Sequence, residues 1–232
     1  MEYSPGLALL TGIVEAGTAV WIFLSGTPGR KRILQPIGLI LLLLAGYQFA
    51  EVTVCFRPEN LLYSRLAFLD ITWLPPLGLW LCAEMAFPKQ RWLKAAAWAD
   101  IALALGLSIW IFADPGAITK SVCMTVIASY SHAGTFEIAY GLFYQSSLVL
   151  TVFGAAAGMA SIEDAVRRKH LANLQTGILG FLFPALAVRI VLAEPEGLLP
   201  SVMCHFAVVL AVSLFFAARR EKRAARNEAS GR

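Results

Sequence analysis

Carboxyl groups lie inside the most apolar stretches of this 232-residue chain and are its clearest candidates for chemistry. The stretch RLAFLDITWLPPLGLWLCAEM is long enough to cross a bilayer, yet it contains Asp70, Glu84 and the pair Pro75-Pro76. A charge at the bilayer centre costs about 3 kcal/mol on insertion scales, so such groups usually face a bundle interior and serve a function. The chemistry they could support is binding of a proton, a cation or an amine, or acid–base catalysis.

The spacing of polar residues predicts one shared pocket in the outer half of a helix bundle. Residues three or four apart are neighbours on a helix, so Glu137, Tyr140 and Tyr144 share a face. Five apolar segments turn polar faces inward in this way. The pocket would open to the outside and have Asp70 as its floor. Its predicted ligand-binding residues are Gln48, Glu51, Asp70, Trp73, Glu137, Tyr140, Tyr144, Arg189 and His205.

A purely structural role for these groups is the alternative. Polar pairs between membrane helices are common and stabilise by about 0.6 kcal/mol on average. The candidate pairs are Arg189 with Glu51 or Glu137, and Arg65 with Asp70 or Glu59. An excess of acid favours function, because some acids must be protonated or neutralised by a cation, a bound amine or His205. These acids are Glu15, Glu51, Asp70 and Glu137.

The pair Pro75-Pro76 predicts a break in its helix, since proline lacks the backbone N–H and clashes with the preceding turn. A break beside Asp70 and Trp73 is typical of a binding site or of a hinge that transmits a change. A kink that serves packing alone is equally consistent with the sequence.

Cysteine placement predicts a disulfide at the outer end of the bundle, where the compartment is oxidising. Cys123 would bond either Cys55 or Cys204. A metal site made of Cys, His and Glu is conceivable and is left open. Its spacing is poor, because the neighbours Cys204 and His205 point in different directions on a helix.

The elements that position these groups are membrane-spanning helices. The chain is 58% hydrophobic and 15% charged, whereas about a quarter of a soluble domain is charged. A span needs about 20 apolar residues, and seven such runs are separated by loop signals. The predicted fold class is therefore an all-α polytopic membrane bundle. Its spans are 7–25, 33–55, 61–87, 95–113, 136–159, 174–193 and 199–218.

Basic residues orient this bundle. Fifteen of the 19 Lys and Arg fall in the loops 26–32, 88–94 and 160–173 and in the C-terminal tail, all on one side of a seven-helix arrangement. The positive-inside rule places that side in the cytoplasm and the N-terminus outside. We expect a transmembrane domain over 1–218 and a basic cytoplasmic tail over 219–232, with His170 solvated among the cytoplasmic bases.

One longer outer loop, DPGAITKSVCMTVIASYSHAGTF, joins the fourth and fifth spans. It is rich in β-branched residues and serine and is bounded by Pro115-Gly116 and by Gly134. This composition predicts a short β-hairpin or folded lid over the outer face.

Two family resemblances rest on these motifs. RLAF followed by WLPP, within 65–76, resembles the seven-helix N-terminal sensor region of some bacterial histidine kinases. QFAE (48–51), WLP (73–75) and SVMC (201–204) resemble the Gln-x-x-Glu, Trp-x-Pro and Ser-Val-x-Cys pattern of an uncharacterised bacterial seven-helix membrane family. The chain departs from that pattern at Tyr47, Val52 and His205. The second resemblance implies the architecture and a bacterial origin, and it implies no activity.

The function expected from these features is a stand-alone seven-helix sensor or receptor-like protein of the inner (plasma) membrane. It would bind a small ligand or cation, signal to a cytoplasmic partner and hold anionic lipid head groups at its basic tail. A small proton- or cation-coupled transporter is the alternative. A membrane-embedded enzyme comes third, with His205, Glu51 and Asp70 as its acid–base set. No cofactor and no nucleic-acid partner is predicted.

Overall fold

The computed structural model describes residues 5–24, 31–86, 91–123, 128–132, 134–192 and 199–230. Within these ranges only the backbone is described at 31, 91, 188–192, 199–201, 204 and 228–230.

Long apolar helices make up the fold, and a small hairpin caps one end. The helices are α1 Gly6–Leu24, α2 Lys31–Phe56, α3 Leu61–Thr72, α4 Leu74–Ala86, α5 Arg91–Ala113, α6 Gly134–Ser161, α7 Ala165–Leu192 and α8 Leu199–Ser230. The 3₁₀ turn η1 Pro115–Ala117 and the strands β1 Lys120–Cys123 and β2 Ala128–Ser131 lie between α5 and α6. The predicted helical fold and the hairpin after the fourth span are confirmed.

Among the described residues, five helical stretches are long and apolar enough to cross a membrane. They are Gly6–Leu24, Arg32–Phe56, Leu61–Ala86, Trp92–Ala113 and Gly134–Ser161. The third of these joins α3 and α4 end to end. The chain therefore has helices with the length and composition of membrane spans.

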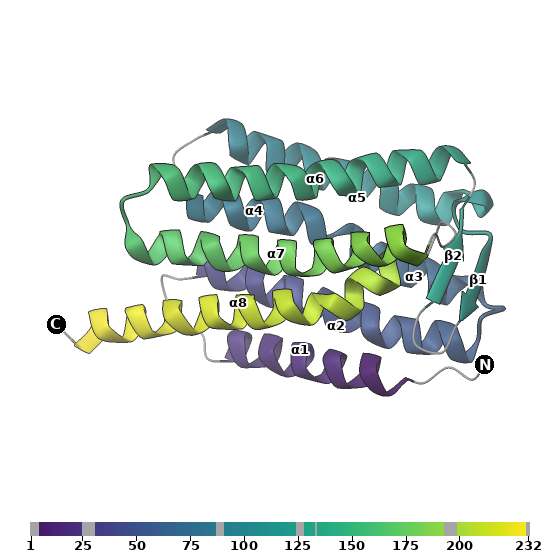
Figure 1. Ribbon diagram of the computed structural model, residues 1–232, viewed down its shortest axis with the longest axis horizontal. Coiled ribbons are helices and arrows are strands. Elements are labelled where there is room, and N and C mark those ends of the chain that lie inside the picture. Colours follow the sequence, from purple (N-terminus) through teal and green to yellow (C-terminus); the bar gives the residue numbers. More distant parts are fainter. Residues whose placement is uncertain are drawn as a thin grey trace.

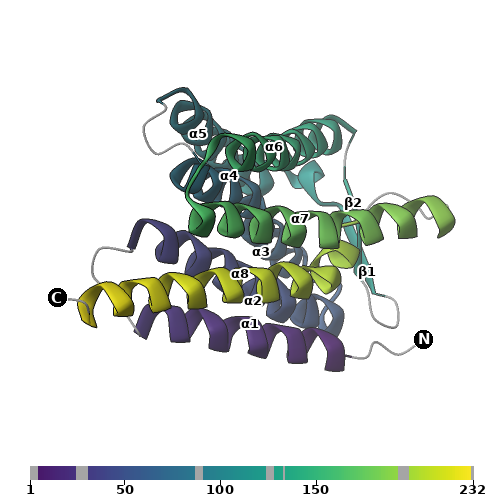
Figure 2. The ribbon, with the colours of Figure 1, turned by 60° about the vertical axis from the view of Figure 1, so that its left-hand side comes forward.

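The helices lie side by side along the long axis of the molecule (Figure 1). Helix α2 is central and contacts α1, α3, α4 and α8, while α7 packs against both α6 and α8. Helices α4, α5 and α6 form the side of the bundle away from α1 (Figure 2). Helix α1 begins at the hairpin end, and α8 ends at the opposite end (Figure 1).

A break at Trp73 separates α3 from α4, at the position where the proline pair predicts one. The Trp73 N–H donates to the carbonyls of Asp70 and Ile71 and so closes α3. Pro75 and Pro76 then occupy the first turn of α4, where a missing N–H costs nothing. The proline pair therefore starts a new helix, α4, directly after α3. Its role as a hinge stays a prediction.

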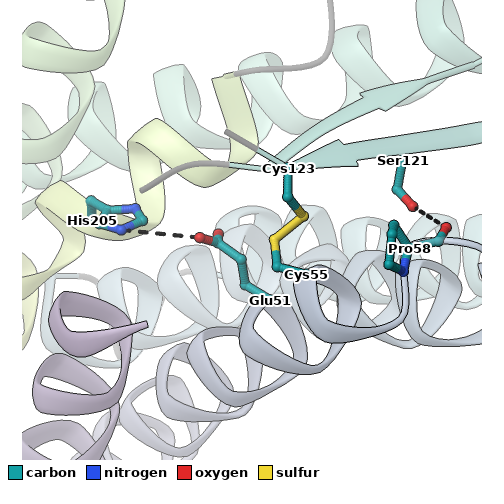
Figure 3. The surroundings of a disulfide bond; sticks show 6 residues. All are labelled: Glu51, Cys55, Pro58, Ser121, Cys123 and His205. Atoms are coloured by element: carbon teal, nitrogen blue, oxygen red, sulfur yellow. Dashed lines mark hydrogen bonds and ion pairs between the residues drawn. A yellow bond between two sulfur atoms is a disulfide. The ribbon is translucent and has the colours of Figure 1, made fainter. Parts of the chain in front are cut away.

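A disulfide fastens the hairpin to the C-terminal end of α2 (Figure 3). Strands β1 and β2 pair antiparallel, with Cys123 opposite Ala128. Cys123 is bonded to Cys55, with 5.5 Å between the Cα atoms, and the Ser121 hydroxyl donates to the Pro58 carbonyl at 2.8 Å. Of the two pairings that the sequence left open, the structure thus has Cys55. The side chain of Cys204 lies outside the described residues.

Removing this disulfide should lower thermal stability. The bond closes a loop with a sequence separation of 68, and native disulfides typically stabilise by about 2–4 kcal/mol. We expect the variant Cys55→Ser/Cys123→Ser, and the reduced wild type, to unfold at a lower temperature in detergent. The double variant serves as the control because reductant should no longer shift its midpoint. If reductant does not change the midpoint of thermal unfolding of the wild type, the disulfide does not have this role.

Candidate functional site

A buried acid–base pair lies directly beneath the hairpin. Glu51 of α2 is one turn below Cys55, and its Oε1 lies 4.0 Å from Nε2 of His205 on α8 (Figure 3). The Glu51 side chain is 0% exposed and that of His205 is 12% exposed. A carboxylate removed from water in this way needs a compensating partner, and His205 can supply one when protonated. Two residues of the predicted pocket are therefore brought together.

The preceding turn of α2 places a further polar residue against α1. Gln48 is fully buried, three residues below Glu51. Its side chain packs on Gly12 of α1, where an added Cβ would lie 3.2 Å from the Gln48 Cβ. The missing side chain at Gly12 thus lets the two helices approach closely at this level. Glu15, one turn further along α1, is also fully buried.

Asp70 lies against the backbone of α2. A Cβ at Gly46 would lie only 2.6 Å from Oδ2 of Asp70. The helix break follows directly at Trp73. The position of Asp70 therefore depends on a glycine of the neighbouring helix and joins the break to α2.

The predicted tyrosines belong to a packed aromatic cluster under the hairpin. The Tyr140 ring stacks on those of Phe136 and Tyr144, with centroids 5.5 and 5.9 Å away. Thr72 at the end of α3 donates to the Tyr140 hydroxyl at 3.4 Å. The ring of Phe68 also contacts Tyr140, at 5.4 Å. This cluster connects the hairpin, α3 and α6.

A neutral histidine connects this cluster to the hairpin. Nδ1 of His132 lies 2.8 Å from the Ala117 carbonyl, to which it donates in the neutral ring. The His132 ring contacts Phe68 and Phe136 at 4.8 and 5.6 Å. Burial lowers the pKa of His132, although the hydrogen bond to Ala117 and the nearby charge of Glu137 act in the opposite direction.

A separate apolar cavity lies deeper in the bundle, beside the start of α4. Its lining includes Leu74, Pro75, Gly78, Tyr144 and Thr151. The rest comes from α2, α6, α7 and α8 and is apolar. Tyr144 is thus the predicted binding residue that reaches this cavity, together with Pro75 of the predicted hinge. A small and mainly apolar molecule would suit such a lining.

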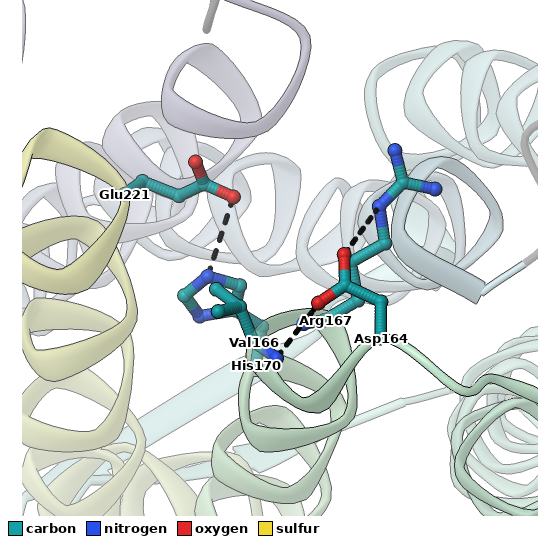
Figure 4. A network of polar contacts seen from close by, with 5 residues as sticks. All are labelled: Asp164, Val166, Arg167, His170 and Glu221. Atoms are coloured by element: carbon teal, nitrogen blue, oxygen red, sulfur yellow. Dashed lines mark hydrogen bonds and ion pairs between the residues drawn. The ribbon is translucent and has the colours of Figure 1, made fainter. Parts of the chain in front are cut away.

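The opposite end of the bundle holds a second buried pair that sequence reasoning missed. Nε2 of His170 lies 3.2 Å from Oε1 of Glu221, and the two side chains are 0% and 2% exposed (Figure 4). The expectation of a solvated His170 is therefore wrong, because the tail is not a loose segment. Helix α8 runs unbroken to Ser230 and buries Glu221 against α7. The signal was available: no glycine or proline interrupts 201–230, and Glu221 continues the apolar face of Leu210, Leu214 and Ala217.

Lys222 connects the same end of α8 to α1. Its Nζ donates to the Trp21 carbonyl at 3.0 Å and lies 3.6 Å from the centroid of the Trp21 ring. Burial lowers the pKa of Lys222 below its ordinary value. The exposed positions of this part of α8 carry the remaining charge, at Arg219, Arg220, Arg223 and Arg226.

Other polar groups of the apolar segments have local partners. Lys94 pairs with Glu84 at 2.8 Å. The Ser147 hydroxyl donates to Asp100 at 2.7 Å. Arg65 donates to the carbonyls of Phe112 and Pro115, at 3.4 and 3.5 Å. These contacts are structural and lie outside the pair beneath the hairpin.

Some predicted features remain untested by the geometry. The side chains of Arg189, Ser201 and Cys204 lie outside the described residues. In the described part of the chain, no three His, Cys, Asp or Glu side chains group as metal ligands. Comparison with protein-family models, with characterised proteins and with solved structures found no match for this chain. The family resemblances stay predictions.

The contact between Gly46 and Asp70 gives a mutational prediction. Gly46→Ala should destabilise by about 1–3 kcal/mol, because the added methyl group overlaps the carboxylate. Gly17→Ala is the matched control, since nothing lies within 4 Å of a Cβ there. In an Asp70→Ala background the cost of Gly46→Ala should largely disappear, which a double-mutant cycle of unfolding in detergent measures. A cost that persists unchanged would refute the contact.

The hairpin should loosen in mild acid. The pKa of His132 is lower in the folded state than in the unfolded state. Between these two pKa values unfolding takes up a proton, so the free energy of unfolding decreases as the pH is lowered. Amide exchange of β1 and β2, corrected for intrinsic rates, should rise by up to about tenfold per pH unit between about pH 6.5 and the folded-state pKa. Asp114 should not contribute, because hydrogen bonds from Trp110 and Gly116 hold its pKa below the usual carboxyl range.

The variant His132→Gln tests the source of this pH dependence. It removes the titrating ring, so the exchange of the two strands should become independent of pH across the same range. An unchanged pH dependence in His132→Gln would assign the effect to another group.

Proposed function

We propose that the chain is a stand-alone seven-helix membrane sensor that binds a small ligand or cation in its outer half. If α3 and α4 are taken as one passage, the described helices make seven passages along the long axis of the bundle. The proposed orientation has the hairpin outside and the C-terminal end of α8 in the cytoplasm, which is the side of the fifteen basic residues. The membrane would be the inner (plasma) membrane of a bacterium.

One observation carries the sensing role: a single helix joins the two buried acid–base pairs. Helix α8 holds His205 against Glu51 near the hairpin and Glu221 against His170 at the other end. The two α8 residues are about 24 Å apart along the helix axis. An unbroken helix transmits a shift or rotation over this distance, because it moves as a rigid rod between packed neighbours.

The trigger would be a change of charge at the outer pair. A cation that binds Glu51 would take the place of His205 as the partner of this carboxyl group and so weaken the contact between α2 and α8. Helix α8 then repositions against α1 and α7, where Lys222 and Glu221 make their contacts. A cytoplasmic partner or an anionic lipid surface would read the exposed arginines at this end.

A proton- or cation-coupled transporter is the second candidate. Buried histidine–carboxylate pairs at both ends of the bundle favour it, since transporters place titrating groups along their pathway. A belt of buried apolar residues separates the two pairs and favours the sensor. This belt includes Ile22, Leu34, Ile37, Leu41 and Leu44.

The distance between α1 and α8 at the inner end tests transmission. Spin labels at Leu24→Cys and Arg223→Cys, in a Cys82→Ala/Cys204→Ala background, report this distance in nanodiscs. We expect Glu51→Gln to shift the mean distance by about 1–2 Å or more, the usual size of helix displacements in switching interfaces. Glu163→Gln, an exposed acid between α6 and α7, is the matched control and should leave the distance unchanged.

Two results would overturn the sensor. If Glu51→Gln leaves the distance between the two spin labels unchanged, α8 does not transmit a change at the outer pair to the inner end. Uptake of protons or alkali cations into proteoliposomes that is abolished by Glu51→Gln would assign the outer pair to transport.

A further inference from the structure

Within the part of the chain that the structure describes, Glu15 differs from the other buried acids in having no partner. Its side chain is 0% exposed, and neither carboxyl oxygen has a hydrogen-bond partner among the described residues. The hydroxyl of Thr11, one turn away, already donates to the carbonyls of Leu7 and Ala8. Glu15 is therefore an unpaired carboxyl group enclosed by protein, not a residue that pairs helices.

The register between α1 and α2 locates this carboxyl group. Gly12 faces Gln48 and Phe49, and Phe23 faces Gly38, so the two helices run antiparallel. Glu15 lies between these two contacts, on the buried face of α1. Glu15 lies about 5 Å further from the hairpin, along the axis of α1, than the level of Gln48.

Charged groups on the neighbouring helices stand on either side of this level. Toward the hairpin, α2 contributes Glu51 and α8 contributes His205. Toward the opposite end, α8 contributes Lys222, which reaches α1 at Trp21, and Glu221. Trp21 is six residues beyond Glu15, or about 9 Å along α1. None of these groups donates a hydrogen bond to Glu15.

The two directions away from Glu15 differ in polarity. Toward the hairpin, Gln48 and then Glu51 follow at steps of about 5 Å, which single water molecules can bridge. Toward the inner end, the buried face of α1 continues with Ala19 and Ile22, packed against the apolar face of α2. Along the buried faces of the described parts of α1 and α2, polar side chains thus continue from Glu15 toward the hairpin, and apolar side chains continue toward the inner end.

The surroundings of Glu15 favour a proton over a metal or alkali cation as its ligand. An ionised carboxylate without a partner is strongly disfavoured inside a protein, whereas the protonated acid is tolerated far better. Metal and alkali cations require several oxygen ligands, and a single carboxyl group does not supply them. A proton needs no further ligand.

We propose that Glu15 is a proton-binding site that exchanges only with the outer side, through Gln48 and Glu51. The site holds its proton in the resting state and is closed inward by the apolar belt. The proposal rests on the orientation given above but not on the sensing role, because it requires no movement of α8.

Labelling with dicyclohexylcarbodiimide in proteoliposomes tests the protonated state. The reagent adds to a protonated carboxyl group, taking the acid proton on nitrogen and the carboxyl oxygen on its central carbon. We expect mass spectrometry to find Glu15 labelled near neutral pH, at least about tenfold faster than the exposed Glu163, with a rate that falls up to tenfold per pH unit as the proton is lost. Glu15→Gln should remove the label.

An infrared measurement covers the case in which the reagent does not reach the site. The carboxylic acid C=O band of the wild type should be missing in Glu15→Gln. Absence of both the label and the band would show an ionised Glu15 and overturn the proposal.

Sidedness is tested with uniformly oriented proteoliposomes. The rate at which Glu15 is labelled should change with the outer pH and should not depend on the inner pH. In Gln48→Leu, this rate should respond severalfold more slowly to a jump of the outer pH. Thr18→Val, on α1 beyond Glu15, is the matched control and should leave the response unchanged. A rate that follows the inner pH would overturn one-sided access. Protection by sodium or potassium at constant pH would overturn the proton as the ligand.

Discussion

A carboxyl group enclosed in an apolar helix bundle must be neutralised, and this requirement organises much of the structure. An unpaired charge in such an interior costs far more than a hydrogen bond returns, so each buried acid carries either a partner or a proton. The solutions differ from site to site. Glu51 faces His205, Glu221 faces His170, Glu84 faces Lys94 and Asp100 accepts a hydrogen bond from Ser147.

These pairings also determine which helices belong together. The two histidine–carboxylate pairs join α8 to α2 at one end and to α7 at the other. Lys222 adds a contact from α8 to α1. Helix α8 is therefore held by polar pairs at both ends and by apolar packing between them. Such an element has few degrees of freedom relative to its neighbours.

The hairpin end is constrained by different means. A disulfide to α2, a hydrogen bond from Ser121 to Pro58 and an aromatic cluster around Tyr140 hold it in place. The cluster also reaches Thr72 at the helix break. Rigid packing at this end leaves the pair Glu51–His205 enclosed but close to the surface, since His205 retains some exposure.

The sequence by itself determined the helical character, the hairpin and the break at the proline pair, because hydropathy, β-branched composition and a missing N–H act locally. It also marked Glu51 and His205 as buried polar groups. Only the tertiary structure decided that these two meet, that Asp70 rests on Gly46, that Cys123 bonds Cys55 and that His170 is buried against Glu221. Helical periodicity specifies which residues share a face, but the partner of that face depends on how separate helices are packed and rotated, and no local pattern encodes this.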